Sequence, residues 1–146
     1  MRITHSGDFQ VARSSQEVFD FLTDPEKFAP LLPDFKSVEK TNDAYLIKLV
    51  VGVSHIRGTA ALKLRLEESQ PHHKASYVGT GSMAGGSVNL NAGFELSSAD
   101  GGTRVDWTGE AQVFGRIASL ARGLLQPLAK KNIQQMIDSL QAELAR

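Results

Sequence analysis

The last thirty or so residues repeat their apolar side chains with the period of an α-helix. Most members of this stripe fall three or four positions apart, and they are Ile117, Leu120, Ala121, Leu124, Leu128, Ile133, Met136, Ile137, Leu140 and Leu144. A helix of this length spans about 45 Å and has to bury its broad apolar face against another layer of structure. Pro127 has no amide hydrogen and crowds the carbonyl of Gly123, so we expect a kink between two helical pieces there.

The chain before this helix alternates apolar and polar residues with the period of a β-strand. A first strand is predicted over 2–11, where Ile3, His5 and Phe9 share one parity. Six more strands are predicted over 35–41, 44–51, 55–67, 72–81, 86–98 and 102–114. Turn-forming residues separate them, and within them one parity is apolar while the other is polar. An antiparallel meander with one buried and one solvated face is therefore expected.

Two short helices are predicted between the first and second strands. Ser14 or Ser15 is suited to cap the first helix, and Asp24-Pro25 ends it and opens the second, which stops near Pro33. The predicted order is a strand, two short helices, six strands and a long helix. This order indicates an α+β fold in which a seven-stranded, curved antiparallel sheet surrounds the C-terminal helix.

Composition narrows the class of protein. The chain has 146 residues, 41% hydrophobic and 22% charged, and no repeat or linker divides it, so one domain over 1–146 is expected. It contains no cysteine, which excludes cysteine-based zinc sites, iron–sulfur clusters and thiol nucleophiles. Its 16 Lys and Arg balance 16 Asp and Glu, so nucleic acid is not an expected partner. With no apolar leader segment, a cytoplasmic location is expected.

The sequence offers little support for catalysis. The four histidines lack the spacing of a metal site, so no metal or other cofactor is expected. No GxSxG motif is present, and no catalytic residue is assigned. The glycines of Gly79-Thr80-Gly81 join strand to strand rather than strand to helix, which argues against a phosphate-binding loop.

Two positions are the only candidates for polar chemistry inside the domain. His5 shares the parity of buried residues, so a structural histidine is favoured and hydrogen bonding to a ligand is the alternative. His55 and Arg57 have the solvent-facing parity. A β-bulge at Gly58 would instead turn Arg57 inward, where its charge would bind a carbonyl or carboxylate.

The remaining candidate site is apolar. Side chains from the short helices, the strands and the long helix are expected to face one internal space, and the expected lining is Phe28, Leu31, Tyr45, Tyr77, Leu90, Phe94, Trp107, Leu120, Leu124 and Leu128. Small residues of the inward parity leave room there, namely Gly79, Gly81, Ala92 and Ala111. Core packing is the alternative for each residue taken singly. The curved sheet favours a pocket for a hydrophobic small molecule.

Several short segments occur in an order that resembles a known family. They are Phe21-Leu22-Thr23-Asp24-Pro25, Val51-Gly52-Val53 with Ile56-Arg57-Gly58, Gly79-Thr80-Gly81, Gly85-Gly86-Ser87, Gly101-Gly102-Thr103-Arg104 and Gly115-Arg116-Ile117-Ala118. Together they resemble the carbon monoxide dehydrogenase G-subunit family, which implies a START-like helix-grip domain whose sheet encloses a hydrophobic cavity. The sequence departs from the family at Asp34, where a glycine is usual.

The resemblance also implies a biological role. It points to an accessory of an aerobic, molybdenum-containing carbon monoxide dehydrogenase or a related hydroxylase, in maturation or in coupling to the membrane and its quinones. Some members carry a C-terminal membrane anchor, whereas this sequence stops at Arg146, so we expect only transient, peripheral contact with the inner membrane face.

Three functions remain open at this point. The leading one is noncatalytic binding of a quinone or lipid in the internal space. The alternative is a cyclase or hydratase acting on an aromatic or polyketide-like substrate, for which His5 and Arg57 are the candidate residues. The third is a protein-interaction adaptor with a filled core, which would present an exposed apolar patch instead of a pocket.

Overall fold

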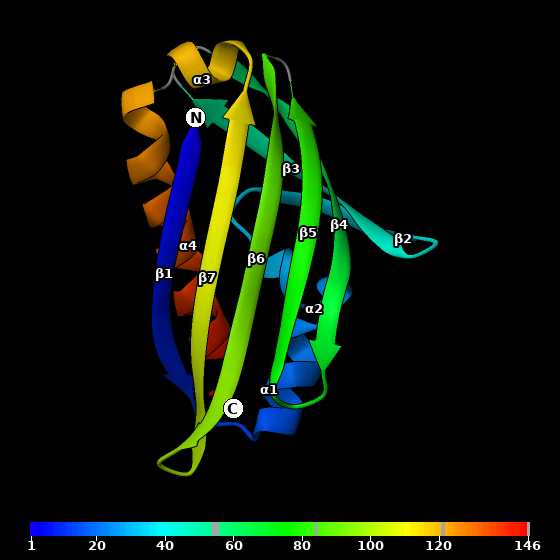
Figure 1. Cartoon of the computed structure of the whole chain (residues 1–146), viewed down its shortest axis with the longest axis vertical. Helices are drawn as coiled ribbons and strands as arrows, with labels where there is room; N and C mark the ends of the chain where they lie inside the picture. Colours follow the sequence, from blue (N-terminus) through cyan, green and yellow to red (C-terminus); the bar gives the residue numbers. More distant parts are fainter. Residues whose placement is uncertain (54–55, 84, 121, 146) are drawn as a thin grey trace.

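The computed structural model describes residues 1–53, 56–83, 85–120 and 122–145. One antiparallel sheet curves past the long C-terminal helix, with the short helices beside it (Figure 1). In chain order the elements are β1 (Arg2–Val11), α1 (Ser15–Leu22), α2 (Pro25–Phe28), η1 (Ala29–Leu31, a 3₁₀-helix), β2 (Phe35–Thr41), β3 (Ala44–Val53), β4 (Ile56–Gln70), β5 (Lys74–Met83), β6 (Gly86–Ala99), β7 (Gly102–Phe114), α3 (Arg116–Leu120) and α4 (Arg122–Glu143). The predicted α+β arrangement is confirmed.

The sheet is a meander of six strands to which the first strand is added at one edge. Its order is β1-β7-β6-β5-β4-β3-β2, so β2 to β7 each pair with their neighbours in sequence, while β1 lies beside β7. The turns use residues that tolerate the left-handed region, with φ of 43° at Asn42, 66° at His72 and 81° at Gly101. The seven predicted strands all form. The boundaries differ for β3, which continues to Val53, for β4, which continues to Gln70, and for β5, which runs two residues later than predicted.

Local side chains start the two short helices at the predicted places. The Ser14 hydroxyl accepts a hydrogen bond from the Glu17 amide at 3.2 Å, and the Asp24 carboxylate accepts one from the Glu26 amide at 3.1 Å. Each bond satisfies an amide that has no partner inside its helix. Pro25 occupies the first turn of α2, where a missing N–H has no cost. The second predicted helix is divided into α2 and the 3₁₀-helix η1.

The long helix α4 runs along the inner side of β1 and reaches η1 (Figure 1). Its last turns bury Ile137 and Leu140 against the sheet, as does Leu144 just after the helix, and Gln141 donates from Nε2 to the Gln10 carbonyl at 3.0 Å. Two helical pieces were expected to meet at Pro127, but Pro127 lies inside α4. The two described C-terminal helices, α3 and α4, instead lie on either side of residue 121. The helix therefore fastens the edge strand β1 and covers only part of the sheet's inner face.

The departure at Asp34 has a conformational basis. Asp34 has a φ of 57°, in the left-handed region that glycine enters without a steric penalty, and its carbonyl accepts a hydrogen bond from the Val50 amide at 2.9 Å. A glycine at this position would form the same backbone bond with less strain.

We therefore expect Asp34→Gly to raise the free energy of unfolding by about 0.5 kcal/mol, because relief of left-handed strain exceeds the added chain entropy of glycine. Urea denaturation followed by circular dichroism measures this difference. Asp43→Gly is the control, since Asp43 is not among the residues with positive φ and should lose stability. A lower stability for Asp34→Gly than for the wild type would contradict this explanation.

Candidate functional site

The inner face of the sheet is shared among three separate buried clusters. The lower cluster, at the end of the molecule where β1 ends, consists of Phe9, Val11, Val18, Phe19, Ala75, Leu96, Val105, Ile137, Leu140 and Leu144. The upper cluster consists of Ile3, Ile117 and Leu125, and the lateral cluster of Ala29, Ile47, Leu64 and Tyr77. Residues of the inner parity between these clusters, including Leu90, Ala92 and Ala111, are only half-buried. The middle of the inner face is thus less filled than its margins.

Gly109 marks the open part of this middle region. It lies on β7 with the inward parity of Val105 and pairs with His5 on one side and Ala92 on the other. Apart from Gly109 itself and its two chain neighbours, no heavy atom of the described residues comes within 4 Å of a Cβ built on Gly109. Interior positions normally make van der Waals contact on all sides, so this position borders unfilled space.

The glycines predicted to leave room on β5 do not do so. A Cβ on Gly79 would meet Leu64 Cδ1 at 3.1 Å, and one on Gly81 would meet Val88 Cγ1 at 2.8 Å. Large neighbours therefore lean into the space that these glycines vacate. The room on the inner face lies over β7, at a glycine outside the predicted set, although the parity of Val105 and Trp107 also identifies Gly109 as inward.

Two polar side chains beside Gly109 have buried atoms without partners. His5 Nε2 and Trp107 Nε1 are buried, and neither has a hydrogen-bond partner among the residues that the structure describes. Both side chains have the inward parity, on adjacent strands. A buried donor or acceptor without a partner costs about 1–3 kcal/mol of stability. Such atoms inside a fold therefore call for a water molecule or a ligand group beside them.

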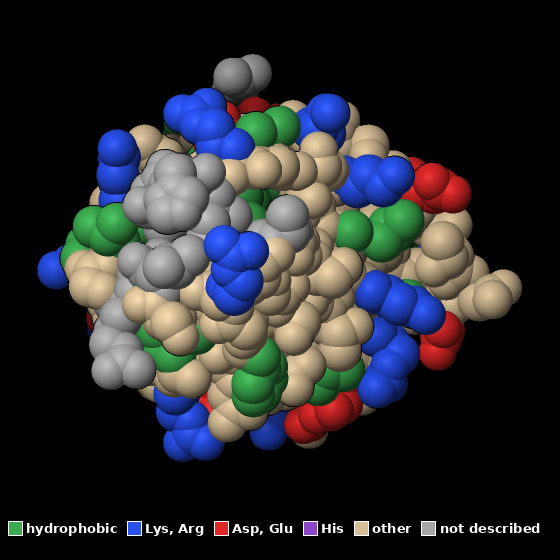
Figure 2. All heavy atoms as spheres, turned by 90° about the horizontal axis from the view of Figure 1, so that it is seen from above, with side chains coloured by type: hydrophobic (Ala, Val, Ile, Leu, Met, Phe, Trp, Pro, Cys, Tyr) green, Lys and Arg blue, Asp and Glu red, His purple; other side chains and the backbone are tan. Residues whose placement is uncertain are grey.

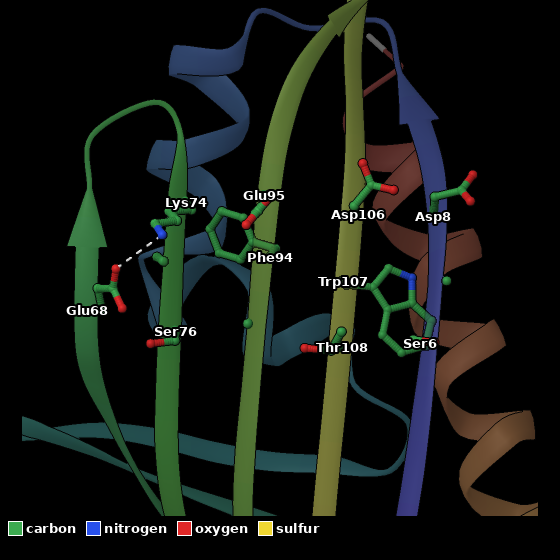
Figure 3. A pocket seen from close by; sticks show the side chains of 13 residues that line it. Ser6, Asp8, Glu68, Lys74, Ser76, Phe94, Glu95, Asp106, Trp107 and Thr108 are labelled. Atoms are coloured by element: carbon green, nitrogen blue, oxygen red, sulfur yellow. Dashed lines mark ion pairs between the residues drawn. The ribbon is translucent and has the colours of Figure 1, made fainter.

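The position of Trp107 depends on a glycine in β1. Gly7 pairs with Trp107, and a Cβ built on Gly7 would lie 3.0 Å from Trp107 Cζ2 and 3.3 Å from Nε1. The indole therefore lies across β1 at a position where only a residue without a side chain gives it room. Figure 3 shows Trp107 reaching from β7 toward β1. This contact directs the unpartnered N–H toward the strand that carries His5.

The two predicted tyrosines have different surroundings. Tyr77 belongs to the lateral cluster, has the ring of Phe28 edge-on at 6.0 Å, and donates its hydroxyl hydrogen to the Leu22 carbonyl at 2.9 Å. Its polar group is therefore used to hold α1. Tyr45 is half-buried on β3, and the Lys40 ammonium lies 5.9 Å from its ring centre.

The other predicted lining residues are spread over the clusters. Phe94 has its ring edge-on to Phe19 at 6.2 Å, and Phe94, Trp107 and Leu31 all pack against the lower cluster. Leu90 packs against the lateral cluster and Leu128 against the upper one. Leu124 is 52% exposed. The side chain of Leu120 lies outside the described part of the structure. Trp107 is the predicted lining residue nearest to Gly109 along the chain.

Arg57 does not enter the inner space. The pairing of β3 with β4 continues without a shift through Val51 opposite Gly58, and Arg57 is exposed. The bulge of β4 lies between Leu66 and Glu68, in its pairing with β5. The proposed inward cation therefore has no structural basis, and His55 lies outside the described residues.

A hollow of about 610 Å³ lies on the opposite, outer face of the sheet (Figure 3). Its lining includes charged side chains, with Lys74 bound to Glu68 at 3.5 Å and Asp8 and Asp106 bound to Arg104 at 3.4 and 3.1 Å, and it also includes Ala75, Phe94 and Trp107. These ion pairs are solvent-exposed, so an apolar ligand in this hollow would lie beside hydrated charged groups. The strand pattern did not predict this hollow.

The described residues contain neither a metal centre nor a membrane-spanning helix. Within the described ranges, no group of three or more His, Asp or Glu side chains is placed to hold a metal ion. No helix in those ranges has the length and apolar character needed to cross a membrane.

Comparison with known proteins gives a family and a fold. The family whose sequence model matches residues 7–145 is described as the carbon monoxide dehydrogenase G-subunit (CoxG). A conserved protein from Geobacillus kaustophilus is similar in structure, with a TM-score of 0.86, 22% identity, and coverage of 97% of this chain and 95% of that one. The Zhui aromatase/cyclase from a Streptomyces species has a TM-score of 0.70 at 16% identity, covering 99% and 94%. No curated protein matches the chain. The predicted helix-grip fold is confirmed.

Tyr77 also makes stability depend on pH. Burial raises the pKa of the Tyr77 hydroxyl far above its usual range, and the charges of Tyr45 and Asp24 add to this effect. Because the unfolded tyrosine ionises near pH 10 and the folded one does not, its stabilising contribution is complete below pH 10 and is lost as the pH rises further.

We expect Tyr77→Phe to lower the free energy of unfolding by about 1–2 kcal/mol at pH 7, since the Leu22 carbonyl loses its donor. Above pH 10 the stability of this variant should fall less steeply than that of the wild type. Denaturant titrations at a series of pH values measure both effects, with Tyr45→Phe as the control. Equal alkaline slopes for Tyr77→Phe and wild type would refute the assignment.

Proposed function

Because the chain belongs to the carbon monoxide dehydrogenase G-subunit (CoxG) family, we propose that it is a noncatalytic protein that binds a hydrophobic small molecule, a quinone or a lipid. The binding site is the space between the middle of the sheet and α4. The open position over Gly109 is the observation that carries this proposal. It lies among half-buried apolar residues of β6 and β7, which is the lining an apolar molecule needs.

The distribution of polar groups favours binding over catalysis. Acid–base chemistry needs groups that converge on one reacting atom. Arg57 is exposed, and the Tyr77 hydroxyl is already bonded to Leu22. His5 is the candidate that faces the inner space, and one imidazole with an apolar surrounding suits recognition of a ligand.

Family membership supports an accessory role. We propose that the protein serves an aerobic, molybdenum-containing carbon monoxide dehydrogenase or a related hydroxylase, in maturation or in coupling that enzyme to membrane quinones. A carrier that shields an apolar molecule from water would meet this need, because such a molecule crosses the aqueous phase poorly.

The end of the molecule that carries α3 suits brief contact with a membrane. Phe114, at the end of β7, is 46% exposed, and Leu124, in the first turn of α4, is 52% exposed. Arg57 and Arg116 are exposed near the same end. Figure 2 looks onto this end and shows Lys and Arg side chains spread around it with hydrophobic side chains between them. Apolar side chains flanked by cations favour an anionic bilayer surface.

A cyclase or hydratase is the second candidate. The likeness of the fold to that of the Zhui aromatase/cyclase and the inward position of His5 favour it. In that case the protein would convert an aromatic or polyketide-like molecule into a product before releasing it, whereas a carrier releases its ligand unaltered.

Filling the open position tests the binding site. We expect Gly109→Leu to remain folded and to reduce the amount of co-purifying or added quinone or lipid at least about tenfold, because the new side chain occupies the space. Native mass spectrometry with organic extraction measures the bound molecule and shows whether it is altered. Thr108→Leu, one residue away on the outer face, is the matched control. Undiminished uptake by folded Gly109→Leu would rule out this site.

Removing the exposed apolar side chains tests the membrane contact. We expect Phe114→Ser combined with Leu124→Ser to lower binding to anionic phospholipid vesicles at least about fivefold, since burial of these side chains in the interface is lost. Vesicle co-sedimentation measures the bound fraction. Leu66→Ser removes a similarly exposed side chain from β4 and should leave binding unchanged. Equal losses in both variants would count against a defined membrane-binding end.

A further inference from the structure

We infer that His5 and Trp107 form the polar end of the internal site and bind an oxygen atom of an otherwise apolar ligand, such as the carbonyl of a quinone. This inference rests on the proposed function and specifies the chemistry that the site recognises. Its basis is the coincidence of three features on adjacent strands: the unpartnered His5 Nε2, the unpartnered Trp107 N–H, and the open space at Gly109.

The sheet register places these three features together. His5 lies directly opposite Gly109, and Trp107 lies opposite Gly7, one inward position along each strand. Inward neighbours at such diagonal positions lie within reach of large side chains. The contact between the indole and Gly7 draws Trp107 toward β1. Both polar atoms therefore border the region where a ligand would enter beside Gly109.

The protein itself offers these atoms few other partners. The backbone N–H and C=O groups that β1 and β7 turn toward each other are used in the hydrogen bonds that pair the two strands. The nearest carboxylates along the strands have the opposite parity and are paired with arginines: Asp8 and Asp106 bind Arg104, and Glu110 binds Arg2. The Tyr77 hydroxyl is bonded to Leu22. A partner for His5 and Trp107 therefore has to come from a molecule inside the site.

The chemistry of the two groups defines that molecule. An indole N–H only donates, so the ligand atom beside Trp107 has to be an acceptor. An imidazole nitrogen either donates or accepts, so His5 is compatible with a carbonyl or a hydroxyl. The indole carries no charge, and apolar residues lie around both groups. Both facts disfavour carboxylates and phosphates as ligand groups. A quinone, or another flat apolar molecule with a carbonyl or hydroxyl oxygen, fits these requirements better than a hydrocarbon.

A pair of probes that differ only in oxygen tests the inference. Menadione is a methylated naphthoquinone, and methylnaphthalene has the same ring skeleton without the two carbonyl oxygens. Isothermal titration with the full chain, supported by equilibrium dialysis, gives the affinity of each probe. The variants are His5→Phe and Trp107→Phe, which keep an aromatic ring and remove the polar atom, and His73→Phe is the control on an exposed histidine.

We expect the wild type to bind menadione about tenfold more tightly than methylnaphthalene. Each variant should lose about three- to tenfold in menadione affinity while its methylnaphthalene affinity changes by less than about twofold. Without ligand, His5→Phe should melt no lower than the wild type, because it removes a buried polar atom that has no partner. Trp107→Phe should melt somewhat lower, because the smaller ring gives up part of the packing of the indole.

Four results would overturn the inference. If both probes bind the wild type equally, or if the preference for menadione persists in both folded variants, His5 and Trp107 do not recognise oxygen, while the proposed binding function stands. If the folded variants lose affinity for both probes alike, the two side chains act only through their shape. If the wild type binds neither probe, while quinone and lipid are also absent from the purified protein, the proposed function fails and the inference fails with it.

Discussion

One helix is too narrow to cover a sheet of seven strands. Strands spaced about 4.8 Å apart make a sheet about 29 Å across, whereas a helix with its side chains is about 10–12 Å wide. Here α4 lies along β1 and reaches η1, while α1, α2 and η1 cover the lower and lateral parts of the inner face. The uncovered remainder is the middle of β6 and β7. The candidate site is therefore a direct consequence of how the inner face is shared among the helices.

Most of the fold follows from local patterns in the sequence. Alternating apolar residues predicted all seven strands and their inward faces, because side-chain direction in a strand depends only on parity. The caps at Ser14 and Asp24 also follow from local sequence, since each hydrogen bond joins residues two or three positions apart. The family resemblance, read from the ordered glycine-containing segments, agrees with the match over residues 7–145. It also drew attention to Asp34, whose positive φ explains why glycine suits that position.

The details of the site depend on contacts between distant residues, and sequence patterns do not contain them. Gly79, Gly81 and Gly109 all have the inward parity, but leucine and valine neighbours fill the space beside the first two. Tyr77 was expected to line the internal space, whereas its hydroxyl is bonded to a carbonyl in α1. The interior role considered for Arg57 required a bulge at Gly58, whereas pairing with β5 places the bulge after Leu66. The lack of partners for His5 and Trp107 likewise becomes visible only when all neighbours are placed.

The pairing of β1 with β7 has a consequence for how the protein assembles. Every other pair of neighbouring strands is joined by a hairpin, but β1 and β7 join segments near the two ends of the chain. Closing such a long loop costs more chain entropy than forming a hairpin, and contacts of this kind slow folding. His5 and Gly7 lie on β1, so one wall of the site is completed only when the two ends of the chain have met. A chain still emerging from the ribosome can form the hairpins of the meander, but the candidate site cannot be complete before β7 has been synthesised.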